Sequence, residues 1–156
     1  MKTKEIEICV YNLENLFIKD AFYHPPNINY FKSKLKLNLL KNVFNEINAD
    51  IYALTEIGFI ESLEFFNQHY LNDEYEIFHQ KGNSDRGIEN GFLVRRGLPY
   101  TFEHHTHIEK QIDFQQYNED NLDYFLSRDF SHLRVIRPDG SHLLSLLNVH
   151  LKSQRD

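Results

Sequence analysis

The sequence has one cysteine, no long apolar stretch and fewer basic than acidic residues, and each shortage excludes a class of protein. Cys9 has no second cysteine to pair with, which excludes an intrachain disulfide, and its apolar surroundings predict a buried core thiol. No segment is apolar over the length of a membrane span, and the N-terminus shows no apolar signal core. We therefore expect a cytoplasmic protein without a membrane span.

The charge balance limits the kind of surface that the chain can offer. It has 17 basic and 23 acidic residues, a formal net charge of -6, which argues against a broad basic surface that grips nucleic acid nonspecifically. A phosphate-ester substrate remains compatible with this charge, because a bound divalent cation supplies positive charge locally. The 156 residues, 41% of them hydrophobic, suffice for one folded domain.

The spacing of apolar residues predicts the order strand, helix, strand, helix and then several strands. Helical spacing covers residues 30–47 and 60–70. Strands are expected at residues 5–11, 49–55, 74–78, 92–95, 100–108, 130–137 and 141–149. This order indicates an α/β or α+β layered domain.

The connecting segments are predicted from their turn residues and their polarity. Pro138, Asp139 and Gly140 separate the last two strands, and their turn chemistry predicts a hairpin. Residues 12–17 and the polar residues 110–127 are expected to be loops.

Three polar residues, Asn12, Glu56 and His150, each follow an apolar strand. Phosphoester hydrolysis at neutral pH needs a cation to neutralise the phosphoryl oxygens and donors to hold them. Mg²⁺ accepts one or two carboxylate ligands and keeps several waters, so this small set suffices. Taken singly, each residue has an ordinary explanation: a turn former, a charge at a strand end and a partly buried histidine with a partner.

Four motifs that follow one another along the chain favour a functional role for these residues over the ordinary explanations. They are Tyr11-Asn-Leu-Glu-Asn15, Ala49-Asp-Ile-Tyr-Ala-Leu-Thr-Glu56, Arg86-Gly-Ile-Glu-Asn-Gly-Phe-Leu-Val94 and Asn148-Val-His-Leu151. In this order the chain resembles the endonuclease/exonuclease/phosphatase superfamily, with Thr55 at a position where that family usually has glutamine. The resemblance implies a DNase I-like sandwich of mixed sheets flanked by helices.

The resemblance also implies roles for individual residues. Glu56 would bind Mg²⁺ or Mn²⁺, Asn12 would help to hold the metal and the phosphate, and His150 would donate to the scissile phosphate or the leaving group. Arg86, Arg128 and Asn148 would contact phosphate, although Arg86 beside Asp85 is ordinarily a solvated turn pair.

Two motifs of that family, a Gly-Asp-Phe-Asn type and a terminal Ser-Asp-His type, are missing from the chain, which ends soon after His150. We therefore expect residues 1–156 to be the N-terminal part of one such domain without its C-terminal catalytic half, and inactive alone. An open sheet face predicts self-association or a longer parent protein.

Three functions stay open at this point. The first is that the parent protein is a metal-dependent phosphodiester hydrolase acting on nucleic acid. The second is that it is a phosphomonoesterase or a phospholipid head-group phosphodiesterase of the same fold. The third is that the chain is a noncatalytic fragment that binds a partner. Two other groups are expected to play no such part. His104, His105 and His107 lack further zinc ligands, and Lys32, Lys34 and Lys36 are expected to spread over a solvated helix face.

Overall fold

The computed structural model describes residues 5–21, 28, 30–82, 84, 87–107 and 130–151. Two helices and seven strands lie in this part of the chain, and none of its helices is long and apolar enough to cross a membrane. The elements are β1 (Ile8–Leu16), α1 (Lys34–Ile47), β2 (Ile51–Ile57), α2 (Ile60–Tyr70), β3 (Tyr75–His79), β4 (Glu89–Arg95), β5 (Thr101–His105), β6 (Ser131–Ile136) and β7 (His142–Asn148).

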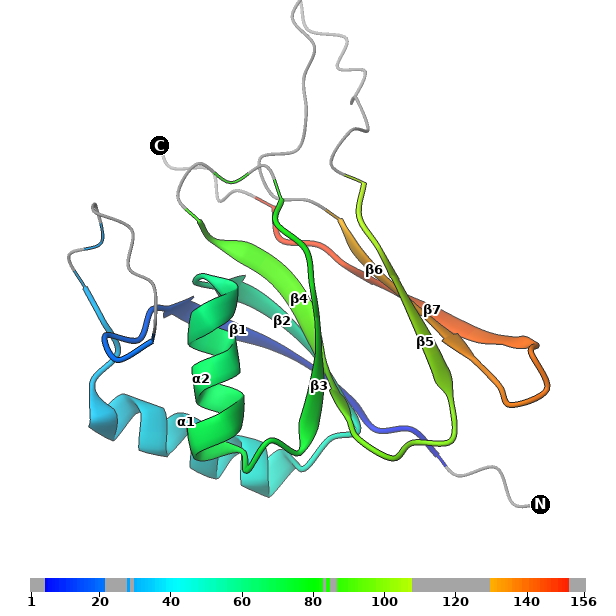
Figure 1. Ribbon diagram of the computed structural model, residues 1–156, viewed down its shortest axis with the longest axis horizontal. Helices are drawn as coiled ribbons and strands as arrows, with labels where there is room; N and C mark the ends of the chain where they lie inside the picture. The colour runs from blue at the N-terminus through cyan, green and yellow to red at the C-terminus, as the bar shows by residue number, and fades with distance from the viewer. Residues whose placement is uncertain are drawn as a thin grey trace, which may run out of the picture.

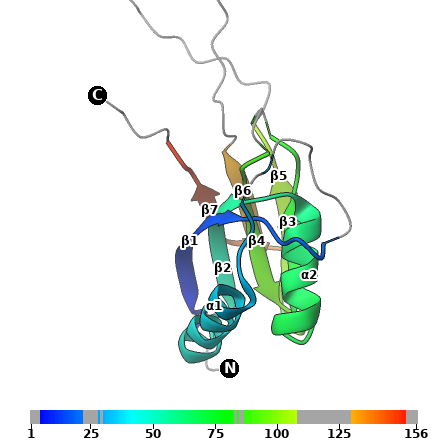
Figure 2. The ribbon, with the colours of Figure 1, turned by 90° about the vertical axis from the view of Figure 1, so that its left-hand side faces the viewer.

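The described strands form two sheets that lie face to face. The first has the order β1-β2-β4-β3, with β1 and β2 parallel and the other pairs antiparallel, and the second has the order β5-β6-β7 and is antiparallel throughout. Both helices cover the outer face of the first sheet, and the second sheet lies against its other face (Figures 1 and 2). The protein is therefore a mixed α/β domain, as the order of elements predicts.

Alternation along β2 divides the core between these layers. Tyr52 and Leu54 point to the helices and join the cluster that contains Phe44, whereas Ile51 and Ala53 point to the second sheet. All four side chains are almost completely buried. This explains why the strand is a continuous apolar run, since both of its faces are covered.

Helix α1 begins later than the sequence predicts. The Ser33 hydroxyl accepts a hydrogen bond from the backbone N–H of Lys36, so Ser33 is the N-cap and residues 30–33 precede the helix. The helix ends at Ile47, and its C-cap residue Asn48 has a left-handed φ of 53°. Because the start shifts, Lys32 lies outside the helix.

The other predicted elements are present with shifted ends. The α2 range and the hairpin of β6 and β7 are confirmed, with Gly140 at a φ of 82° in the turn. Strand β1 extends to Leu16, through the segment predicted as a loop, and β4 begins at Glu89, before the predicted start. Residues 110–127 lie outside the described residues.

The edge strands β1 and β7 expose apolar side chains. Within the described residues β1 pairs only with β2, and β7 only with β6. Val10 is 73% exposed, Leu147 is 62% exposed and Leu151, just beyond β7, is 67% exposed. Open edges with exposed apolar residues are places where further β structure can add.

His104 predicts a pH-dependent stability for the layer between the sheets. Its Nε2 lies 2.6 Å from the Ser131 hydroxyl, and burial, with smaller effects from His79 and two other histidines, lowers its pKa from 6.5 to about 4. As the pH falls, the unfolded chain takes up this proton before the folded chain does. The stability that neutral His104 contributes is therefore present above pH 6.5 and is lost as the pH falls towards 4. We expect the melting temperature of His104→Gln to fall less than that of the wild type between pH 6.5 and pH 4. Equal decreases in melting temperature would contradict this assignment.

Candidate functional site

Four strand ends meet at one end of the two sheets. The carboxyl ends of the parallel strands β1 and β2 lie beside the amino end of the antiparallel β4. The carboxyl end of β7 joins them from the second sheet (Figure 1). Loops and side chains at this end come from segments that are far apart in the sequence, which is the usual composition of a functional site.

Asn148 connects the two sheets at this end. Its side-chain nitrogen donates to the carbonyl oxygen of Leu54 at 2.7 Å and to that of Gly91 at 3.2 Å. The side chain is buried, with 4% exposure, and the first of these bonds spans 94 residues of sequence. In this arrangement the amide, which the resemblance assigns to phosphate, fixes the position of β7 against β2 and β4.

Glu56 and His150 lie in contact at the same end. The Glu56 Oε1 atom is 3.5 Å from the His150 Nε2 atom, and their side chains are 19% and 20% exposed. Both groups are therefore accessible to a ligand but partly shielded from water. This shielding strengthens any electrostatic interaction that they make.

The backbone at Glu56 is strained. Its φ of 55° lies in the left-handed region, and the pairing register of β2 shifts between Leu54 and Ile57. A side chain larger than that of glycine costs about 1 kcal/mol or more in this region. Such strain is typical of positions at which the direction of a functional side chain matters more than local stability.

Asn12 lies next to Glu56, but its amide oxygen is in use. It pairs with Thr55 in the parallel register, and its Oδ1 accepts a hydrogen bond from the N–H of Glu14 at 2.7 Å. Glu14 and Asn15 both have left-handed φ values, 51° and 57°. The Asn12 amide oxygen therefore stabilises an irregularity within β1, in the same place where the sequence predicts a metal or phosphate ligand.

Two further polar residues lie at this end, and sequence reasoning missed them. Glu89 and Asn90 open β4 and are buried, with 4% and 5% exposure. The Glu89 Oε2 accepts a hydrogen bond from the N–H of Gly82 at 2.9 Å, and Glu89 is the strand partner of Ile57. The signal was the pair Glu-Asn directly before the apolar part of the strand. Arg86 and Arg128 lie outside the described residues.

The donor set fits a hard cation that keeps most of its water. Glu56 offers one partly exposed carboxylate, which agrees with the one or two protein ligands that Mg²⁺ uses beside water and substrate phosphate. Across the described ranges no group of three or more histidine, cysteine, aspartate or glutamate side chains is arranged to hold a metal by itself. A closed site of the structural zinc type therefore does not fit these residues.

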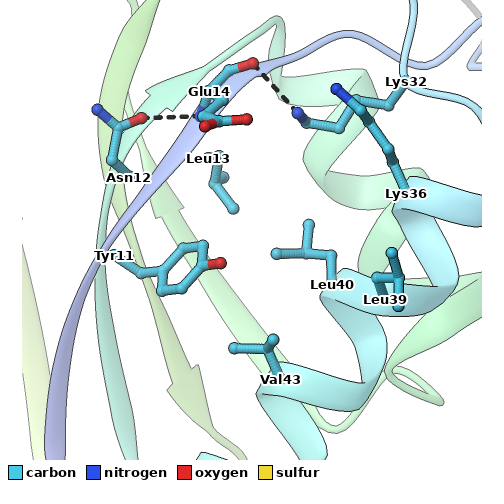
Figure 3. Close-up of a pocket in the computed structure, with 9 residues that line it drawn as sticks. All are labelled: Tyr11, Asn12, Leu13, Glu14, Lys32, Lys36, Leu39, Leu40 and Val43. Atoms are coloured by element: carbon cyan, nitrogen blue, oxygen red, sulfur yellow. Dashed lines mark hydrogen bonds between the residues drawn. The ribbon is translucent and has the colours of Figure 1, made fainter.

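A pocket of about 250 Å³ lies next to Asn12, between β1 and α1 (Figure 3). We call it the β1–α1 pocket. Its lining consists of Tyr11, Asn12, Leu13, Glu14, Lys32, Lys36, Leu39, Leu40 and Val43. Lys32 and Lys36, two of the three lysines that the sequence predicts on a solvated helix face, thus line a concave surface. Lys32 can reach it because it precedes the helix.

A second group of histidines lies on the second sheet and consists of His105 of β5, His107 just beyond that strand and His132 of β6. The rings of His105 and His107 each lie 5.7 Å from the ring of His132, centroid to centroid. Burial lowers the pKa of His132, and His107 and His105 act in the same direction. This lowered pKa favours the neutral form of the His132 ring.

No protein-family model matches the chain, and no curated protein and no solved structure matches it either. A function for the chain is therefore inferred from the residues of this site.

Proposed function

We propose that Glu56, His150 and Asn12 form the metal- and phosphate-binding part of a metal-dependent phosphodiester hydrolase that acts on nucleic acid. The contact of 3.5 Å between Glu56 and His150 carries this proposal, because the two residues come from separate motifs and meet at a strained backbone position. The two packed sheets with helices on one face are compatible with a DNase I-like sandwich, of which this chain would be the N-terminal part.

Each residue would have a distinct task. Glu56 would hold Mg²⁺ or Mn²⁺, and the cation, when bound, neutralises charge on the phosphoryl oxygens. His150 would lie against Glu56, with its Nε2 atom 3.5 Å from the Glu56 Oε1 atom. An N–H of its ring would donate a hydrogen bond to a phosphate oxygen or to the leaving group.

These residues bind and orient, and they do not include a base that removes a proton from water. General-base catalysis requires such a group within hydrogen-bond reach of the attacking water. We therefore propose that the 156-residue chain binds metal and phosphate and has little activity alone, and that a parent protein supplies the base.

A noncatalytic role is the second candidate, and the exposed apolar edges of β1 and β7 favour it. Val10 and Leu147 on these edges would be covered by a second copy of the chain or by the remainder of a parent protein. Sedimentation of the purified chain at increasing concentration is expected to show association. A monomer at every concentration would contradict this assignment.

A substrate panel tests the function. Plasmid DNA, a structured RNA, a phosphomonoester and a sphingomyelin vesicle are incubated with the parent protein and with the 156-residue chain, with Mg²⁺ or with EDTA. We expect Mg²⁺-dependent cleavage of nucleic acid by the parent protein and at least a hundredfold less in its Glu56→Gln variant. Equal cleavage by this variant would overturn the site, and preferred cleavage of the monoester or the lipid would replace the substrate class.

A further inference from the structure

The β1–α1 pocket has an apolar wall and a basic mouth. Leu39, Leu40 and Val43 of α1 face Tyr11 and Leu13 of β1 across it, and the amino groups of the two lysines lie together at the other end (Figure 3). A site with an apolar lining and a few convergent polar groups is the usual form of a small-molecule site. Its volume of about 250 Å³ suits a group of limited size rather than a long chain.

At the mouth of the pocket the two lysines lie beside the Glu14 carboxylate (Figure 3). The Lys32 Nζ donates to the carbonyl oxygen of Glu14 at 3.2 Å, which fixes the position of the ammonium group at this end. Burial lowers the pKa of Lys32, and Lys36 acts in the same direction, while Glu14 and Glu56 oppose the shift. A phosphate group placed between the two ammonium groups would restore the stabilisation that burial and mutual repulsion remove.

The inner part of the pocket offers a hydrogen-bonding group as well as apolar surface. The Tyr11 hydroxyl points into the pocket and makes no hydrogen bond to another described residue, and its ring is held edge-on by Phe44 at 5.9 Å. An acyl chain would leave this hydroxyl without a partner, whereas a nucleobase can bond to it and can also pack on the ring.

The pocket adjoins the site at Glu56. Asn12 lines the pocket and is the strand partner of Thr55, the residue before Glu56. The charge of Glu56 is near enough to Lys32 to act on its pKa. A ligand in the pocket would therefore lie beside a phosphate that is bound at Glu56 and His150.

We propose that the β1–α1 pocket binds the nucleotide next to the scissile phosphodiester, with its base on Tyr11 against Leu40 and Val43 and its own phosphate on Lys32 and Lys36. This inference rests on the proposed function, since it names a subsite for the same substrate. It assigns to Lys32 and Lys36 a recognition role that their sequence spacing does not predict.

Binding to the 156-residue chain tests the subsite without any need for catalysis. Adenosine 5′-monophosphate, inorganic phosphate and a short-chain phosphatidylglycerol below its micelle concentration are titrated separately into ¹⁵N-labelled protein in EDTA. The variants are Lys32→Gln and Lys36→Gln. Lys34→Gln is the matched control, because Lys34 is exposed, carries the same charge and does not line the pocket.

We expect the nucleotide to shift the amide signals of residues 11–14 and 36–43 and to bind more tightly than phosphate. Each pocket variant should weaken its affinity about fivefold to tenfold, as expected for one partly screened ion pair to phosphate, while Lys34→Gln leaves it unchanged. Equal weakening by Lys34→Gln would show nonspecific attraction and overturn the subsite. Tighter binding of the lipid at the same signals, or no nucleotide binding at millimolar concentration, would overturn it as well.

Glu56→Gln separates the failure of this inference from that of the proposed function. Glu56 does not line the pocket, and its negative charge near Lys32 does not attract a phosphate, so nucleotide binding in EDTA should be at least as tight in this variant. Nucleotide binding without any Glu56-dependent metal binding would leave the pocket in place and remove the hydrolase. Glu56-dependent metal binding without nucleotide binding would keep the proposed hydrolase site and remove the nucleotide subsite.

Discussion

Asn148→Leu is expected to lower the free energy of unfolding by about 3 kcal/mol. The substitution leaves the carbonyl oxygens of Leu54 and Gly91 without their donor between two packed sheets, and each unpaired buried group costs about 1–3 kcal/mol. Urea unfolding followed by circular dichroism measures the change. Leu147→Asn is the matched control, because Leu147 is exposed on the preceding position, and it should change stability by less than about 0.5 kcal/mol.

This result would also bear on the site. Asn148 is two residues before His150, so loss of its two hydrogen bonds releases the end of β7 from β2 and β4. The contact between His150 and Glu56 depends on that attachment. Wild-type stability of Asn148→Leu would contradict the assignment of Asn148 as the link between the sheets.

Glu56→Gly and Glu56→Ala are expected to weaken metal binding equally and yet to differ in stability. Both remove the carboxylate, and loss of the one charged ligand should weaken Mn²⁺ affinity at least about a hundredfold. Glycine tolerates the φ of 55° and alanine does not, so Glu56→Gly should be more stable than Glu56→Ala by about 1 kcal/mol. Thermal unfolding and Mn²⁺ titration of the two variants measure both effects.

The comparison separates strain from ligand chemistry. If the alanine variant equals the glycine variant in stability, the left-handed backbone at Glu56 stores no strain. If either variant binds Mn²⁺ as the wild type does, Glu56 is not the metal ligand.

Periodicity predicted the elements well and failed where polar residues continue a strand. Helix α2 and the β6–β7 hairpin follow from apolar spacing and from the Pro-Asp-Gly turn. The sequence predicts that strand β1 ends before Asn12, because Asn12 is a turn former. The strand continues to Leu16 because β2 resumes pairing after a register shift, and a single strand's residues do not reveal such a bulge.

Glu56 and His150 each follow an apolar strand in the sequence, and the structure places them in contact, although their roles remain predictions. Strand ends that follow apolar runs are visible in sequence. The placement of Lys32 and Lys36 is not, because it depends on the helix starting at Lys34, which the cap at Ser33 decides. The bonds of Asn148 are likewise a property of the packing of two sheets.

Paramagnetic broadening by Mn²⁺ tests the central claim most directly. Substoichiometric Mn²⁺ is added to the ¹⁵N-labelled chain, and the loss of each amide signal is measured in the wild type and in Glu56→Gln. We predict that broadening centres on residues 12, 56 and 150 and disappears in the variant, because Glu56 supplies the charged ligand. Broadening centred instead on His105, His107 and His132, or unchanged in Glu56→Gln, would contradict the metal site and the hydrolase proposed from it.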